Sequence, residues 1–343
     1  MIQRVIGKSV IGATHIKNQL ECQDSIGKYV LDDGVYVLVV ADGHGSSSCP
    51  YSKEGSDRAC RAFVDVMKNL YENYNNDLDS LATYLNREGD TSVAMDVCIR
   101  WQEKVKSAHY NAHRPMPKTD DGLIQKEKLF RLYGTTLIGL LVTKEFLFAL
   151  QIGDGDLSFV SDEGFQYVVE AEKILGVEAH SLSKLDAWKK SVTTLRRYER
   201  IESPSLFLLS SDGFSNSYIG EDGYENACVD YFNTIKKYGP DAVEGALEGW
   251  LTETSEKGCG DDISLVMLYS YDGQASPASV SEEEETDKAA SYAAAAEPAA
   301  EEAEVEQPAA ELAPAEEAQP VTPRKESPCS EVEASESEVT ENE

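Results

Sequence analysis

Three strongly apolar segments that each end in Asp-Gly constrain the fold of this chain more than any other feature. They are VYVLVVADG at Asp42-Gly43, FLFALQIGDG at Asp154-Gly155 and SLFLLSSDG at Asp212-Gly213. Runs of valine, leucine and phenylalanine bounded by glycine are typical of buried β-strands. A fourth apolar segment, ISLVML, is instead preceded by Asp261 and Asp262. If this segment runs antiparallel to the others, the carboxylates meet at one edge of the core.

Carboxylates that converge in a setting of low dielectric constant repel one another, so they need cations or protons between them. Oxygen ligands without thiolates or a histidine cluster suit Mg²⁺ or Mn²⁺ better than Zn²⁺. Asp-Gly after a strand is also a common turn, so a purely structural role is the alternative at each position. The repetition of the pattern favours a metal site.

The rest of the chain up to about residue 271 alternates between helical and strand patterns. Residues 56–74 place Ala59, Phe63, Val64, Met67 and Leu70 on one helical face, and a second helix is expected from about Thr91 to His113. Further strands are expected at 157–162 and 165–171, and further helices at 226–238 and 242–255. This order favours sheets covered by helices over a parallel βαβ array.

The composition changes abruptly near Tyr271. From Ser276 to Glu343 the chain consists mainly of Ala, Glu, Pro and Ser, with 20 acidic and 3 basic residues. Too few large apolar side chains remain there to offset the cost of ordering. We therefore expect one domain over residues 1–272 and a disordered, acidic, Ala/Glu/Pro-rich tail over residues 273–343. The tail is expected to be solubilising; a partner-binding segment or a phosphorylated tether is the alternative.

Charge and cysteine usage narrow the class of protein. The net charge of −31 argues against binding to nucleic acid or to an anionic membrane, both of which reward a basic surface. The sequence shows no secretion signal and no apolar run of the roughly 18 residues that span a bilayer. The seven cysteines are scattered, as is usual in a reducing compartment. We expect a cytoplasmic protein.

Six motifs in a fixed order resemble the metal-dependent type 2C protein phosphatases, which act on phosphoserine and phosphothreonine. They are ECQDS at 21–25, VVADGHG at 39–45, Gly134-Thr135-Thr136, IGDGDLSFV at 152–160, LLSSDGFSN at 208–216 and GDDISLVML at 260–268. The resemblance covers residues 12–271 and is strongest to bacterial members. It implies an α+β fold: a four-layer αββα sandwich of two mainly antiparallel sheets flanked by helices.

The resemblance also implies a set of metal ligands. Asp42 matches the aspartate that bridges two metal ions, and the Gly43 carbonyl binds one of them. Asp212 matches the aspartate of the second ion, and Asp261 matches the aspartate of the closing motif.

Three further residues complete the set that the resemblance implies. Asp24 matches an acid that binds a metal directly or through water, and Asp154 matches a residue that helps to hold a third, weaker ion. His44 matches a histidine proposed to protonate the leaving seryl or threonyl oxygen, which suits its unperturbed pKa near 6.5. The alternative for His44 is an imidazole that caps a turn.

The expected function follows from these roles. Two Mn²⁺ or Mg²⁺ ions activate a water that attacks phosphorus in line, while the ions neutralise the phosphoryl oxygens. The expected partner is a phosphoprotein substrate of a Ser/Thr kinase. A nucleotide loop is excluded as an explanation of ADGHGSSS, because neither a P-loop nor a dinucleotide fingerprint occurs.

Two departures from the family leave an alternative open. Gln23 stands where many members have Glu, and the segment before it offers only Lys17 where many have an arginine that grips the phosphate. Arg196 and Arg197 are not expected near the metals. These departures favour, as the alternative, a weak or inactive pseudophosphatase that serves as a binding module. Residues 174–205 take the place of the family's variable flap, and His180 within them is expected to be structural or to face the substrate.

Overall fold

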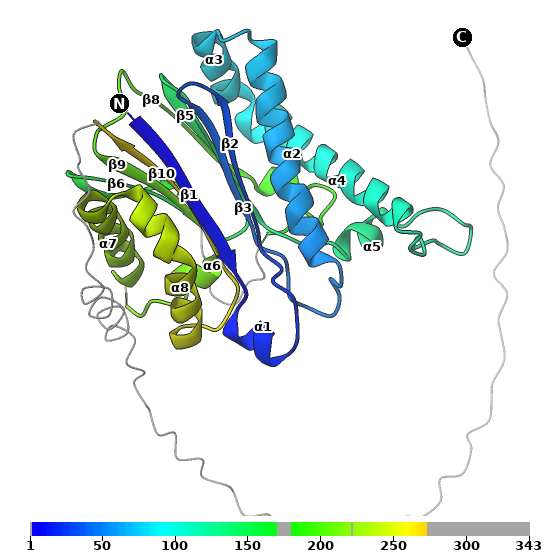
Figure 1. The fold of residues 1–343 in the computed structure, drawn as a ribbon. Helices are drawn as coiled ribbons and strands as arrows, with labels where there is room; N and C mark the ends of the chain where they lie inside the picture. Colours follow the sequence, from blue (N-terminus) through cyan, green and yellow to red (C-terminus); the bar gives the residue numbers. More distant parts are fainter. Residues whose placement is uncertain (1, 170–179, 221, 273–343) are drawn as a thin grey trace, which may run out of the picture. The chain divides into compact units, whose positions relative to one another are not determined.

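The structure is a computed structural model that describes residues 2–169, 180–220 and 222–272 (Figure 1). It consists of two five-stranded sheets packed face to face, with helices on both outer faces. Every strand pairing in the described residues is antiparallel. The expected αββα sandwich is therefore confirmed. The expected acidic tail, residues 273–343, lies outside the described residues.

The first sheet has the strand order β1-β10-β9-β6-β7. Its strands are β1 (Ile2–Val10), β10 (Ile263–Tyr271), β9 (Ser205–Ser210), β6 (Asp156–Ser161) and β7 (Gly164–Val169). The pairing of Val10 with Ile263 brings the chain that follows β1 next to the start of β10. The N-terminal and C-terminal strands of the domain are thus neighbours.

The second sheet has the strand order β2-β3-β4-β5-β8. Its strands are β2 (Ser25–Asp32), β3 (Val35–Ala41), β4 (Leu137–Val142), β5 (Phe146–Ile152) and β8 (Val192–Arg197). The start of β4 pairs with the end of β5, Leu137 with Ile152. The ends of β3 and β5 therefore lie at the same edge.

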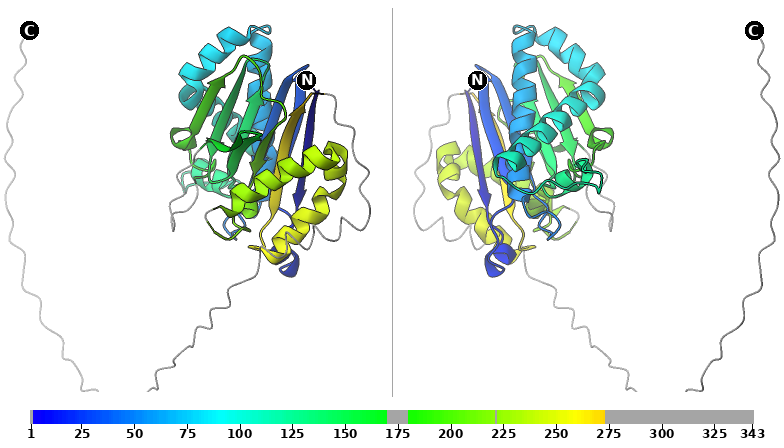
Figure 2. Two further views of the ribbon diagram at one scale, coloured as in Figure 1. Left: turned by 90° about the vertical axis from the view of Figure 1, so that its left-hand side faces the viewer. Right: turned by 90° about the vertical axis from the view of Figure 1, so that its right-hand side faces the viewer.

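Helices cover the outer face of each sheet, as Figure 2 shows. Over the second sheet lie α2 (Ser52–Asn73), α3 (Leu78–Glu88), the π-helical turn Gly89–Val93, α4 (Ala94–Asn111), α5 (Lys126–Arg131) and the 3₁₀ turn Ala187–Lys190. Over the first sheet lie α7 (Gly223–Tyr238) and α8 (Pro240–Lys257). The short helices α1 (Ala13–Lys17) and α6 (Asp212–Ser215) follow β1 and β9.

The apolar runs lack alternation because their strands are buried on both faces. In β3, Val37 and Val39 belong to the core under α2, whereas Leu38 and Val40 belong to the core between the sheets. All four side chains are at most 1% exposed. Burial of this kind stabilises the fold by roughly 1.5–3 kcal/mol for each large side chain. The strands that end in Asp-Gly are therefore rigid supports for the residues that follow them.

Most expected elements agree with the structure, whereas several elements, β2 and α3 among them, are not predicted from the sequence. The second long helix begins at Ala94, after a π-helical turn, rather than at Thr91. Residues 192–197 of the segment expected to be a flap form edge strand β8, because the β5 backbone needs a partner there. Strand β1 is not predicted from the sequence. It is half-exposed, so it lacks the continuous apolar run that marks a buried strand.

No helix in the described part of the chain is both long enough and apolar enough to cross a lipid bilayer.

Candidate metal centre

Four carboxylates from four separate segments meet at one edge of the sandwich. Ser25 pairs with Ala41, so Asp24 and Asp42 extend the β2–β3 pair by one position. Leu265 pairs with Ser210, so the start of β10 lies beside the end of β9. Gly213, which follows Asp212, lies beside Asp261 there: a Cβ added to Gly213 would be 3.4 Å from the Asp261 Cβ.

These carboxylates act on one another across the two sheets. Burial raises the pKa of Asp42 well above its usual range, and the charges of Asp24, Asp212 and Asp261 raise it further. Burial likewise raises the pKa of Asp24 to about 7, with a further rise from the charges of Asp262 and Asp261. Partial burial raises the pKa of Asp261, and the charges of Asp212 and Asp262 raise it further. Asp24 and Asp42 are therefore poorly solvated, and the charges of Asp212 and Asp261 act on this pair.

Asp24 provides the clearest test of whether this site suits a cation. Its side chain is 1% exposed, and among the described residues neither of its carboxylate oxygens has a hydrogen-bond partner at normal geometry. The nearby Ser211 and Ser264 hydroxyls lower the pKa of Asp24 and so offset part of the rise that burial causes. Oxygens left bare in this way normally carry a large energetic cost, which a bound cation relieves. The all-oxygen donor set fits Mg²⁺ or Mn²⁺.

The side chains do not form a closed coordination cage as they stand. Within the described residues, no group of three or more His, Cys, Asp or Glu side chains is gathered closely enough to enclose an ion. The described carboxylates therefore converge on the site without enclosing an ion.

The Thr135-Thr136 motif fixes the backbone of Asp42. The Asp42 carbonyl accepts hydrogen bonds from the Thr136 N–H at 2.8 Å and from the Thr135 hydroxyl at 2.7 Å. The Asp42 N–H donates to the Thr136 hydroxyl at 3.1 Å. Gly43 is required for close packing, because a Cβ there would lie 2.5 Å from the Gln23 carbonyl oxygen. The turn after β3 is thus held from both sides.

His44 lies directly after this turn and is half-buried. Its backbone N–H donates to the Gly134 carbonyl at 3.0 Å, and a Cβ on Gly134 would lie 2.6 Å from His44 Cδ2. The imidazole therefore packs against the backbone of Gly134. Its catalytic role stays a prediction.

Asp154 lies in the turn between β5 and β6, at the same edge. The Gln151 amide donates to the Gly155 carbonyl at 2.6 Å and to the Gly153 carbonyl at 3.2 Å, which fixes the turn around Asp154. Gly153 has φ of 124° and packs against Thr136. The role of Asp154 at a weaker third metal site stays a prediction.

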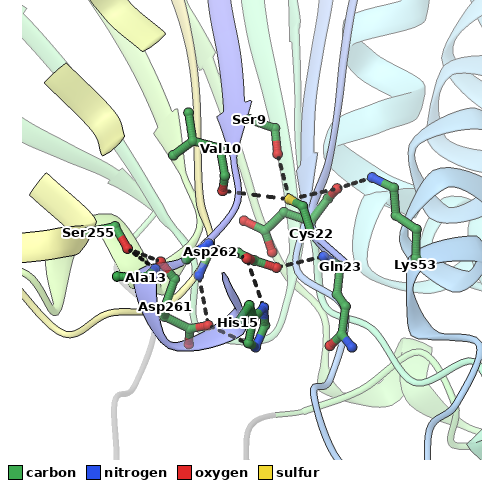
Figure 3. A network of polar contacts seen from close by, with 12 residues as sticks. Ser9, Val10, Ala13, His15, Cys22, Gln23, Lys53, Ser255, Asp261 and Asp262 are labelled. Atoms are coloured by element: carbon green, nitrogen blue, oxygen red, sulfur yellow. Dashed lines mark hydrogen bonds and ion pairs between the residues drawn. The ribbon is translucent and has the colours of Figure 1, made fainter. Parts of the chain in front are cut away.

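The second acid of the closing motif, Asp262, has a different environment from Asp261. It is 3% exposed, and its carboxylate accepts hydrogen bonds from the N–H groups of Gly12 at 2.7 Å and Gln23 at 2.6 Å (Figure 3). It also contacts the His15 ring at 2.8 Å. Asp262 therefore ties together the segments after β1 and before β2.

Sequence reasoning missed His15. This residue belongs to α1, and its ring lies between Asp262 and Asp261 (Figure 3). The only signal that points to it is the register of β1 against β10, which requires β1 to be recognised as a strand. By contrast, Lys17 on the same helix is exposed.

The remaining cations considered from the sequence lie elsewhere. Arg197 pairs with Asp79 at 2.6 Å, and Arg196 donates to the carbonyls of Tyr167 and Val168. Arg197 is opposite Phe146 at the start of β5, the far end from Asp154. The expectation that these arginines lie away from the carboxylates agrees with the structure. His180 is exposed beside the Asp154 turn, and its role stays a prediction.

Comparisons with known proteins point to one family and one fold. Residues 11–252 match the family model described as protein phosphatase 2C. A search of curated protein sequences found no match. Among solved structures, a bacterial serine phosphatase is 13% identical with a TM-score of 0.50, and the match covers 80% of this chain and 100% of that one. At this level of identity the likeness is one of fold.

Two other solved structures have slightly lower scores. PppA, described as a key regulatory component of T6SS in Pseudomonas aeruginosa, is 13% identical with a TM-score of 0.49, covering 79% of this chain and 99% of that one. The catalytic domain of the serine/threonine protein phosphatase PstP, solved with two manganese ions, is 15% identical with a TM-score of 0.45 and the same coverage.

Proposed function

Because this chain belongs to the protein phosphatase 2C family, we propose that it hydrolyses phosphoserine and phosphothreonine in proteins with the help of Mg²⁺ or Mn²⁺. The observation that carries the proposal is the buried Asp24 carboxylate. Its oxygens have no hydrogen-bond partner at normal geometry among the described residues, and the charges of Asp262 and Asp261 act on it. A buried site with this much negative charge is stable only with cations or protons in it.

The residues proposed to hold the ions are those that surround this site. They are the carboxylates of Asp24, Asp42, Asp212 and Asp261, the carbonyl of Gly43 and, for a weaker third ion, Asp154. When bound, Mg²⁺ or Mn²⁺ supplies the positive charge that activates a water molecule and neutralises phosphoryl oxygens.

The chain's own groups position the reactants and move one proton. The Thr135 and Thr136 bonds hold Asp42 at a fixed point at the end of β3. His44, anchored through its backbone N–H to the Gly134 carbonyl, is proposed to give a proton from its imidazole to the departing seryl or threonyl oxygen. The substrate is then a phosphoprotein, and no covalent intermediate on a serine or cysteine is needed.

The alternative is a member of the family that binds phosphoproteins without efficient turnover. It is favoured by Gln23, whose side-chain oxygen is buried and neutral at the edge of the site. The same measurements separate the two functions, because a binding module retains the fold and shows no turnover that depends on metal.

The test is hydrolysis of p-nitrophenyl phosphate and of a phosphothreonine peptide by the full chain, with Mn²⁺ and with EDTA. We expect turnover with Mn²⁺ only, and a loss of at least about 100-fold in Asp42→Asn, since a metal ligand is removed. Asp120→Asn, an exposed acid in a loop, is the matched control and should keep the activity. Folded wild-type protein without turnover in Mn²⁺ would overturn the proposal.

A further inference from the structure

The His15 ring contacts two consecutive carboxylates through its two nitrogens. Its Nδ1 lies 2.8 Å from Asp262 Oδ1, and its Nε2 lies 3.9 Å from Asp261 Oδ1 (Figure 3). The His15 side chain is 13% exposed and the Asp262 side chain 3%, whereas Asp261 is 52% exposed. One nitrogen thus contacts the buried Asp262 carboxylate, and the other lies on the side of the more exposed Asp261 carboxylate.

The hydrogen bonds of Asp262 show which nitrogen of the His15 ring carries a proton. The Asp262 carboxylate is surrounded by donors, the N–H groups of Gly12 and Gln23, and it is itself an acceptor. The short contact with His15 therefore requires an N–H on Nδ1. In the neutral ring the lone pair is then on Nε2, and this tautomer is assigned from the hydrogen-bond network.

The Nε2 lone pair faces acceptors rather than donors. The Asp261 oxygen lies 3.9 Å away, and a Cβ placed on Gly45 would lie 3.5 Å from Nε2 and 3.2 Å from the Gln23 side-chain oxygen. Two acceptors that face each other repel unless a cation or a proton lies between them. Two metal–ligand bonds of about 2.1 Å each can bridge a separation of this size. The glycine at position 45 leaves this space free of a side chain.

We propose that His15 Nε2 is a nitrogen ligand of the metal centre, together with Asp261, and that Asp262 orients the ring. This inference rests on the proposed function, because it adds a ligand to that same centre. An acid that holds the distal N–H of a ligating histidine fixes its tautomer and strengthens it as a ligand. An imidazole ligand also favours Mn²⁺ and other transition metals over Mg²⁺, which prefers oxygen.

The test is pulsed electron paramagnetic resonance on the full chain loaded with Mn²⁺, which detects a coordinated nitrogen through its ¹⁴N modulation. We expect this modulation in the wild type and its loss in His15→Asn. Asparagine can keep a donor toward Asp262 and lacks an equivalent of Nε2, so the fold should be retained. Mn²⁺ affinity, measured by titration calorimetry, should fall by about 10–100-fold, and Mg²⁺ affinity by less.

His113→Asn is the matched control. His113 is exposed and has φ of 53°, a conformation that asparagine tolerates well, so this variant should keep the ¹⁴N modulation. Mn²⁺-dependent turnover in a wild type whose Mn²⁺ shows no ¹⁴N modulation would overturn this inference alone. Modulation that survives in His15→Asn would also overturn it. A wild type that neither binds Mn²⁺ nor turns over substrate would overturn the proposed function, and this inference with it.

Discussion

The two ends of the sandwich treat their carboxylates in opposite ways. At the far end, exposed acids are paired with cations: Asp33 with Lys144 at 2.8 Å, Asp79 with Arg197 at 2.6 Å and Asp272 with Arg200 at 3.1 Å. At the other end, acids lie near acids. The charges of Asp24, Asp212 and Asp261 raise the pKa of Asp42, and the charge of Asp261 also raises the pKa of Asp24.

This difference shows where the fold leaves charge uncompensated. Surface ion pairs contribute little to stability, and they are screened by salt. A buried group of like charges is costly, so it is retained where something else supplies the missing positive charge. The contrast between the ends therefore marks the functional edge, and the following experiments test that contrast.

The largest expected effect is a pH dependence of metal-free stability. The pKa of Asp24 is raised in the folded protein, so the folded state binds more protons than the unfolded state between about pH 4 and 7. The free energy of unfolding in EDTA should fall as the pH rises through this window, by at most roughly 4 kcal/mol from Asp24. Urea unfolding at a series of pH values measures it, with Asp24→Asn as the comparison. A stability in EDTA that rises across this window would contradict the prediction.

Mn²⁺ should remove much of this penalty. At a free concentration about 100 times its Kd, an ion that binds only the folded state raises the free energy of unfolding by about 2.7 kcal/mol. Thermal or urea unfolding with and without Mn²⁺ measures the gain, which Asp42→Asn should largely lose. The control Asp79→Asn changes the far end and should respond to Mn²⁺ as the wild type does. An equal gain in Asp42→Asn would mean that Mn²⁺ binds elsewhere.

Neutralising one buried acid should stabilise the metal-free protein. In Asp24→Asn the repulsion is relieved, and the nearby Ser211 and Ser264 hydroxyls can accept from the new amide. We expect a gain of about 1–3 kcal/mol in EDTA at pH 8, together with weaker Mn²⁺ binding. Chemical unfolding in EDTA shows the first and calorimetric titration the second. A clear loss of stability would show that Asp24 is compensated by the protein alone.

An Asp→Asn substitution at the far end should change the free energy of unfolding only slightly, and should lower it rather than raise it. Asp79→Asn removes the partner of Arg197 on the surface, and we expect a loss of about 0.2–1 kcal/mol. The loss should shrink in high salt, because the pair is exposed. Urea unfolding at low and high salt measures it. A gain like that of Asp24→Asn would remove the contrast between the two ends.

Strands buried on both faces could be predicted because their composition alone identifies them. β3, β5, β9 and β10 have almost entirely buried side chains, so their apolar runs are continuous. Edge strand β8, VTTLRR, has no fully buried residue, and its position follows from the β5 backbone beside it. Its strand conformation is a consequence of pairing rather than of side-chain pattern.

The site likewise contains residues that could be predicted from the sequence and residues that could not. Asp42 and Asp212 could be placed from the sequence, because each follows a recognisable strand. His15 and Asp262 lie 2.8 Å apart although 247 positions separate them in the sequence, and no local pattern indicates that contact. The role of Asp262 as an anchor also required the positions of Gly12 and Gln23.

The sequence by itself determined which segments are buried strands and which carboxylates follow or precede them, because hydrophobic patterning is a local property. Only the tertiary structure decided which carboxylates meet and how each is used. Consecutive residues along an extended chain point in opposite directions, so Asp261 is turned toward the open edge and Asp262 into the protein. That choice depends on the register between strands far apart in the chain, which packing of the whole core fixes.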